Sequence, residues 1–379
     1  MWRLVATAAA RCPQRPRGAA VVQTHRRSRA TVTRAEENRH TVDALHRLSV
    51  DVQKIRELKG WVLLRTPAYV DEAAGLLKVL GASGPVVARV LTLHPEAVLC
   101  HPEQMQAQRH LWASVCPDPR ELVGVIEKFP ASFFTCASHH AHQLDNVAYF
   151  RRLNLNKRIV AKLMAGAPQS FSRPVEDNEK MVVALRAAYL ELGGKDANVN
   201  VWLQKLLSQN PFVLLKDPER LGRNVRFLAE KGFTSAQLLG LLSKLRGLVA
   251  ELSPDAMRRA LAFSQSALGC SDDRLCRVVL DCPALLCHSE AVLAQRFQGL
   301  FGAGVGASQI LETPTVLELT TEIVNHRVQR LKACGYDIRT GGLEALGGTK
   351  KDFEASCGKL QQRRERPMFN PVAPLRTDD

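Results

Sequence analysis

The sequence of 379 residues has few aromatic side chains, no long apolar run and little strand-like alternation of apolar and polar residues. Aromatic residues make up 6% of the chain, whereas apolar residues as a whole make up 46%, and Leu, Ala and Val dominate. No stretch approaches the roughly 20 consecutive apolar residues that a membrane-spanning helix needs. We therefore predict an all-α protein with a large core and no membrane span.

Neither of the two clusters of cysteine and histidine has the spacing of a metal site. One lacks the paired CxxC ligands of a structural zinc site, and the other has no accompanying carboxylate pattern. We interpret the cysteines of the first as buried small apolar residues and the second as a loop followed by a helix start, so we predict no metal and no cofactor. The residues concerned are Cys270, Cys276, Cys282, Cys287 and His288 in the first cluster, and Cys136, His139, His140 and His142 in the second.

Acidic residues are absent from the first 35 positions, which carry eight arginines and no lysine. The whole chain has a net charge of +15, so this segment leaves +15 − 8 = +7 for residues 36–379. A basic, acid-free segment of this kind is typical of a mitochondrial transit peptide, which we predict over residues 1–35. A secretory signal fits less well because the apolar stretch 4–10 is short, and an uncleaved basic arm is the other alternative.

A short motif, in which Pro is followed by apolar residues, recurs along the chain. In the copy NPFVLLKDP, Pro211 is predicted to end one helix, and Asp217 and Pro218 to begin the next. Copies of the motif follow one another at intervals of 35, 35, 38, 43, 36, 36 and 31 residues. The first residues of the copies, which we call anchors, are Gly60, Pro95, Pro130, Pro168, Pro211, Gly247, Pro283 and Pro314.

Two further signals follow the anchors. A Pro or a capping residue six or seven positions later, as at Pro254 after Ser253, is predicted to begin a second helix. About 21 to 25 positions after most anchors comes a residue suited to the left-handed end of a helix. These residues are Gly81, Asn154, Gly193, Gly232, Gly269, Gly304 and Gly335. Each unit therefore reads as a first helix, a short bridge that starts at the anchor, and a second helix.

The predicted second helices carry apolar residues 10, 14 and 17 positions after the anchor, as at Leu293, Phe297 and Leu300. These offsets lie within about 40° of one direction at 3.6 residues per turn. A single helix pair cannot bury such a face, whereas stacked pairs can. We therefore predict an α-solenoid of about eight repeats over residues 36–345, followed by a basic C-terminal segment, 346–379.

The bridge between two helices resembles that of the mitochondrial transcription termination factor (mTERF) family, and the resemblance covers about residues 40–360. The stretches KIRELKGWVLL, WLQKLLSQNPFVLL, GFTSAQLLGLLSKL, CPALL and FNPVAP carry it. Tetratricopeptide and pentatricopeptide repeats have a similar period but lack this bridge. The resemblance implies a curved half-ring of mTERF-type repeats, a place in the mitochondrial matrix and nucleoid, and regulation of transcription through double-stranded mitochondrial DNA. Mitochondrial RNA and transcription or nucleoid proteins are further candidate partners, and we expect a monomer.

Cations recur 12 or 13 positions after five of the anchors, away from the apolar stripe. On a solenoid they would stack about 8–10 Å apart, a spacing suited to the phosphates of a nucleic-acid backbone. The two offsets differ by about 100° around a helix, and Asp71 and Glu72 interrupt the pattern in the first unit, so a solvated charged face is the alternative. The candidate phosphate contacts are Lys180, Arg220, Arg223, Arg226, Arg258, Arg259, Arg296, Arg327 and Arg330.

No catalytic motif stands out, and we predict no enzyme. The stretch GAGVGA, residues 302–307, resembles a phosphate-binding loop but follows a predicted helix rather than a strand. The C-terminal segment, with Lys350 and Lys351, is either a second phosphate contact or a solvated tail. Because a fold does not settle function, an RNA-binding factor in ribosome assembly and a protein-binding scaffold are the alternative functions.

Overall fold

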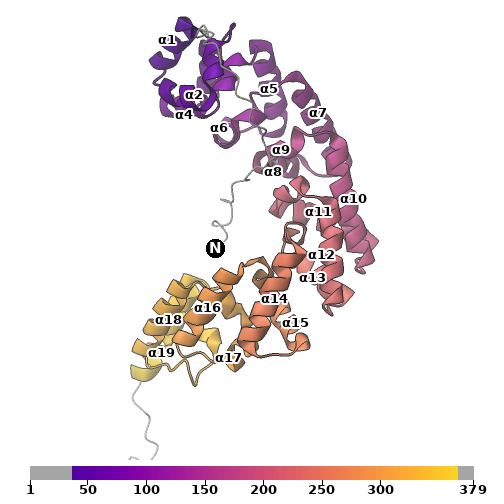
Figure 1. Cartoon of the computed structure of the whole chain (residues 1–379), viewed down its shortest axis with the longest axis vertical. Helices are drawn as coiled ribbons and strands as arrows, with labels where there is room; N and C mark the ends of the chain where they lie inside the picture. The colour runs from indigo at the N-terminus through magenta and orange to yellow at the C-terminus, as the bar shows by residue number, and fades with distance from the viewer. Residues whose placement is uncertain (1–35, 366–379) are drawn as a thin grey trace, which may run out of the picture. The chain divides into compact units, whose positions relative to one another are not determined.

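The computed structural model describes residues 36–365, and over that range the chain is helical without strands, as predicted (Figure 1). The predicted transit peptide lies outside the described residues, as do residues 366–379 with the stretch FNPVAP. No helix among the described residues is long and apolar enough to cross a membrane.

Between residues 36 and 365, the predicted order of first helix, bridge and second helix recurs eight times. The first helices are α2 (Val52–Lys59), α4 (Gly84–Leu93), α6 (Pro119–Lys128), α8 (Lys157–Gly166), α11 (Asp196–Gln209), α13 (Ser235–Lys244), α15 (Asp272–Asp281) and α17 (Ala307–Glu312). The bridges are η1 (Gly60–Leu64), η2 (Pro95–Leu99), η3 (Pro130–Ser132), α9 (Pro168–Phe171), η4 (Pro211–Leu215), η5 (Leu248–Ala250), η6 (Pro283–Cys287) and η7 (Pro314–Glu318). The second helices are α3 (Val70–Val79), α5 (Pro102–Val115), α7 (Ala137–Arg152), α10 (Val175–Glu191), α12 (Pro218–Glu230), α14 (Pro254–Leu268), α16 (Glu290–Gly302) and α18 (Thr321–Ala333).

In six of the eight units, proline sets the break between the first helix and its bridge; the bridges η1 and η5 lack it. Asn210, which precedes Pro211, has φ −138° and ψ 77°, and Cys282, which precedes Pro283, has φ −125° and ψ 72°. Both lie outside the α region because the proline ring clashes with a helical residue before it. The chain resumes as a turn of 3-10 helix, and a capping side chain then starts the second helix, as where Asp217 accepts a hydrogen bond from the Glu219 backbone N–H at 3.0 Å.

The ends of the second helices also follow the prediction. Asn154 has φ +60°, and all six of the predicted glycines have positive φ. A left-handed residue at this point lets the chain leave the helix while its N–H groups still bond the last carbonyls. GAGVGA is one such place, since Gly304 follows the end of α16 and Gly306 caps α17, so it joins two helices.

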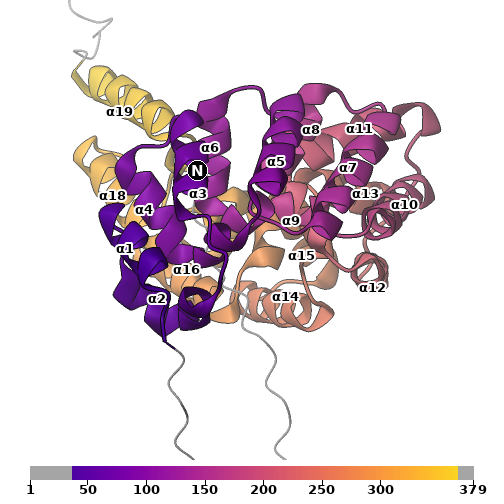
Figure 2. The same ribbon diagram turned by 90° about the horizontal axis from the view of Figure 1, so that it is seen from above.

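Equivalent parts of successive units pack against one another. Second helices contact second helices from α3 through α18, first helices contact first helices from α2 through α11, and η1 contacts η2 as η6 contacts η7. Figures 1 and 2 show the successive second helices side by side. The apolar stripe faces this packing, since Leu293, Phe297 and Leu300 are at most 2% exposed. The structure is thus the predicted α-solenoid.

Additional helices lie before the first unit and after the last. α1 (Arg39–Arg47) packs against α2 and α3. After α18 the chain forms a further bridge, η8 (Leu343–Leu346), and a helix, α19 (Lys350–Glu365), that buries Phe353 and Cys357. The predicted basic segment, 346–379, therefore starts at the last residue of η8 and includes the packed helix α19. Lys350 and Lys351 are exposed on this helix.

Candidate nucleic-acid interface

The candidate cations divide according to their offset from the anchor. With the apolar stripe at offsets 10, 14 and 17, offset 13 lies about 40° from the edge of the stripe, and offset 12 lies on the opposite side of the helix. The structure follows this geometry. Lys180, Arg223 and Arg259, at offset 12, are exposed, whereas Arg296 is half-buried and Arg327 is 4% exposed, both at offset 13.

Three polar side chains at offset 13, those of Asn224, Arg296 and Arg327, bond the bridge of the next unit or the residues just after it. Asn224 of α12 is fully buried and donates from Nδ2 to the carbonyl oxygens of Val249 and, at 2.8 Å, Leu252. Arg296 of α16 donates from Nη1 to the carbonyl oxygen of Leu317 in η7. A single turn of 3-10 helix leaves carbonyls without partners at its end, and these side chains satisfy them.

Arg327 is the most completely engaged of these residues. Its guanidinium donates to the carbonyl oxygens of Leu346, Gly347 and Gly348, the last two at 3.0 and 2.9 Å. Burial lowers the pKa of both Arg327 and Arg296, because a charge is less stable away from water. The guanidinium of Arg327 is therefore committed to joining units, and we remove it from the set of phosphate contacts. Arg296 also joins two units, because its Nη1 donates to the carbonyl oxygen of Leu317.

Three cations at offset 12 form an exposed row on consecutive second helices. Lys180 lies on α10, Arg223 on α12 and Arg259 on α14, and α12 contacts both neighbours. We call these residues the outward row. Arg220, Arg226 and Arg258 are exposed on the same helices, whereas Arg330 lies apart on α18.

Two cations of this region have acidic partners. Arg223 pairs with Asp217 at 3.0 Å and with Glu219 at 3.4 Å, and Arg258 pairs with Asp255 at 2.5 Å. All of these side chains are exposed, so the pairs add little to stability, and a phosphate can replace the carboxylates. Within residues 36–365, the other two members of the outward row have no carboxylate within ion-pair distance.

Comparison with known proteins agrees with this repeat architecture, since the sequence matches the mTERF family over residues 34–354. This chain belongs to the mTERF family. Human mitochondrial transcription termination factor 2 is 47% identical over 345 residues, which cover 91% of this chain and 89% of that protein. The mouse protein of the same name is 44% identical over 344 residues, with the same coverage. Human mitochondrial transcription termination factor 1 is 27% identical over 319 residues, which cover 83% and 79%.

The proteins of the mTERF family, to which this chain belongs, are nucleic-acid-binding factors rather than enzymes. No three His, Cys, Asp or Glu side chains within residues 36–365 gather closely enough to hold a metal ion. Cys282 is fully buried at the start of its bridge, and burial raises the pKa of its thiol to about 12. The cysteine therefore behaves there as a small apolar residue. The prediction of burial is wrong for Cys287, which is exposed, and Cys270 and Cys276 are only half-buried.

Two pairs of buried amides in the first half of the mTERF solenoid were not predicted from the sequence. Gln108 donates to Gln143 at 2.9 Å, and Gln143 donates to the Ser132 carbonyl oxygen at 2.7 Å. Asn178 donates to Asn146 at 2.7 Å. The repeat pattern did contain a signal for one pair, because Gln108 and Gln143 occupy offset 13, beside the apolar stripe. A polar residue is out of place there unless it has a buried partner.

Proposed function

We propose that this chain binds double-stranded mitochondrial DNA through its sugar–phosphate backbone and thereby regulates mitochondrial transcription. The outward row is the observation that carries the proposal. Three exposed cations at one repeat position, on helices that touch, present charge at the spacing of packed helices, about 8–10 Å. The names of the mitochondrial transcription termination factors to which the chain is similar support the compartment and the process.

Binding of this kind is strong in low salt and largely independent of base sequence. Each phosphate neutralised by a cation releases counterions, so the logarithm of the binding constant falls by about 0.9 per contact for each tenfold rise in salt. The bonds within and between the units hold the helices that carry the row, which limits the ordering cost of binding. Base-edge contacts would add selectivity, since phosphate contacts alone carry none.

The test compares two triple variants of the full chain on a labelled duplex over a series of KCl concentrations. Lys180→Ala with Arg223→Ala and Arg259→Ala removes the outward row. Lys205→Ala with Arg274→Ala and Arg277→Ala removes equal charge from exposed positions on the first helices α11 and α15. We expect the first variant to bind about 100-fold or more weakly, with a salt slope smaller by about 2.7, and the second to stay close to the wild type.

Equal losses in the two variants would show a general charge effect and refute the row as the interface. Crosslinking in intact mitochondria, followed by sequencing of bound DNA and bound RNA, tests the ligand itself. Recovery of ribosomal RNA without DNA would reject the DNA proposal in favour of an RNA-binding function.

A further inference from the structure

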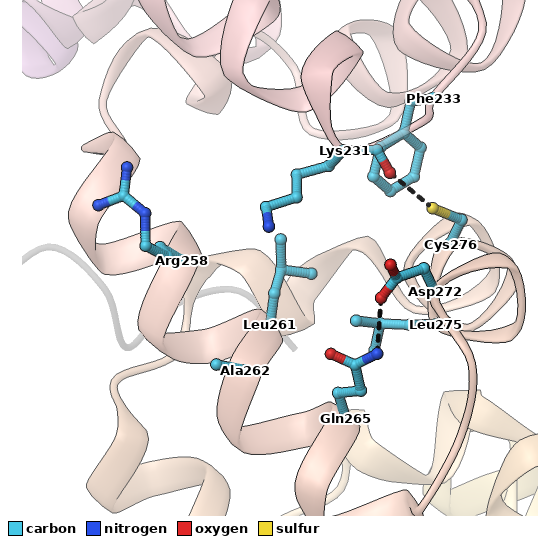
Figure 3. A pocket seen from close by; sticks show the side chains of 9 residues that line it. All are labelled: Lys231, Phe233, Arg258, Leu261, Ala262, Gln265, Asp272, Leu275 and Cys276. Atoms are coloured by element: carbon cyan, nitrogen blue, oxygen red, sulfur yellow. Dashed lines mark hydrogen bonds between the residues drawn. The ribbon is translucent and has the colours of Figure 1, made fainter.

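A small pocket opens where the end of α12, the middle of α14 and the start of α15 meet (Figure 3). Its volume is about 70 Å³, and its lining includes Lys231 from the end of α12, Arg258 from α14 and Asp272 from α15. Figure 3 shows the side chain of Lys231 extending toward α14, on the side of the pocket where Arg258 lies. Lys231 was not among the residues that the repeat pattern singled out.

Arg258 is held in place by its neighbours. Its guanidinium carbon lies 5.4 Å from the ring centre of Phe227, and Asp255 accepts a hydrogen bond from it at 2.5 Å. Phe227 lies four residues after Arg223 and four before Lys231. Residues at this spacing share one face of a helix, so Arg223 and Lys231 lie along the face of α12 that carries Phe227.

The opposite side of the pocket is closed by hydrogen bonds. Gln265 donates to Asp272 at 2.6 Å, and the Cys276 thiol donates to the backbone carbonyl oxygen of Lys231 at 3.4 Å (Figure 3). Phe233, also in the lining, is 4% exposed. Asp272 is the one acidic residue of the lining, so its charge opposes an anion.

We propose that Lys231 and Arg258 form a subsite for one phosphate group of a nucleic-acid backbone, beside the outward row. At roughly 10–15 Å³ for each water-sized group, the pocket holds about five heavy atoms, the size of a phosphate and too small for a base. The guanidinium supplies paired N–H donors and the lysine supplies a point charge. This subsite rests on the proposed function and adds Lys231 to its contact residues.

The first test measures duplex affinity against salt for single variants of the full chain. Lys231→Gln should bind about tenfold more weakly, with a salt slope smaller by about 0.9. Asp272→Asn should bind a few-fold more tightly, because it removes the charge that opposes the phosphate. Lys332→Gln, a matched change at another exposed lysine near the end of a second helix, should leave binding close to that of the wild type.

The second test needs no nucleic acid, so it separates the subsite from the proposed function. The melting temperature of the wild type should rise with millimolar inorganic phosphate at fixed ionic strength, and Lys231→Gln should abolish that rise. A wild type that responds to phosphate but does not bind duplex would reject DNA binding and retain the subsite. If Lys231→Gln matches the wild type in both tests, or if Lys332→Gln changes equally, the subsite is wrong.

Discussion

The guanidinium carbon of Arg327 lies 4.9 Å from the ring centre of Phe353, so a side chain of α18 is stacked on one of α19. The same guanidinium donates to three carbonyl oxygens that lie between the two helices. Arg327→Ala leaves these buried carbonyls without partners and removes the packing on Phe353. We expect a loss of about 2–4 kcal/mol in the free energy of unfolding, measured with urea. Arg330→Ala, on the exposed face of α18, should change it by less than about 0.5 kcal/mol.

Substitutions of Arg296 and Arg223 should have different effects, the first on stability and the second on duplex binding. Arg296 bonds the next bridge, so Arg296→Gln should lower the melting temperature by several degrees. Arg223 bonds only exposed carboxylates among the described residues, so Arg223→Gln should leave the melting temperature within about a degree and weaken duplex binding about tenfold. Thermal unfolding and anisotropy measured on the same preparations check both statements. If Arg223→Gln lowered the melting temperature and Arg296→Gln weakened only binding, the offset from the anchor would not decide whether a cation joins units or binds the duplex.

His288 gives the stability of the fold a dependence on pH. Burial, with a smaller contribution from Arg296, lowers the pKa of His288 to about 4 from its ordinary value of 6.5. Its folded pKa is below its unfolded pKa, so its contribution to stability is complete above about pH 6.5 and is lost as the pH falls toward 4. We expect the melting temperature to fall between pH 7 and pH 5, and to fall less in His288→Gln.

The exposed His110 supplies the control for this experiment. His110→Gln should keep the wild-type profile. His94, whose pKa is also lowered mainly by burial, leaves part of the acid sensitivity in place in both variants. An unchanged profile in His288→Gln would show that this side chain is not the source.

Asn154 tests the ends of the second helices. Its backbone has φ +60°. Most residues with a Cβ adopt this angle at a cost of about 1 kcal/mol or more, whereas glycine adopts it freely and Asn is tolerated. We expect Asn154→Gly to be neutral or slightly stabilising and Asn154→Ala to be destabilising by about 1 kcal/mol, measured by urea unfolding. Equal effects of the two changes would mean that the backbone conformation is not what selects Asn here.

The sequence pattern identified the candidate cations but did not distinguish those that face solvent from those that join units. Offsets 12 and 13 were grouped because both carry cations, although they differ by about 100° around a helix, and in the structure one position faces solvent and the other faces the next unit. The partner of Arg296 is the carbonyl oxygen of Leu317, 21 residues further along the chain. Offset 13 places Arg296 beside the apolar stripe, but a backbone carbonyl has no sequence signature, so the pattern could not identify the Leu317 carbonyl oxygen as the partner of Arg296.

The sequence by itself determined the local course of this chain. Pro211 and its counterparts break helices because a proline ring excludes the α region before it, and Asp217 and Asn154 begin and end helices through bonds and backbone angles within a few residues. The tertiary structure decided which polar side chains are available to a ligand. That choice depends on how far one unit stacks over the next, and stacking brings Arg327 to carbonyls that are 19 to 21 residues away, while Arg223 stays at the surface.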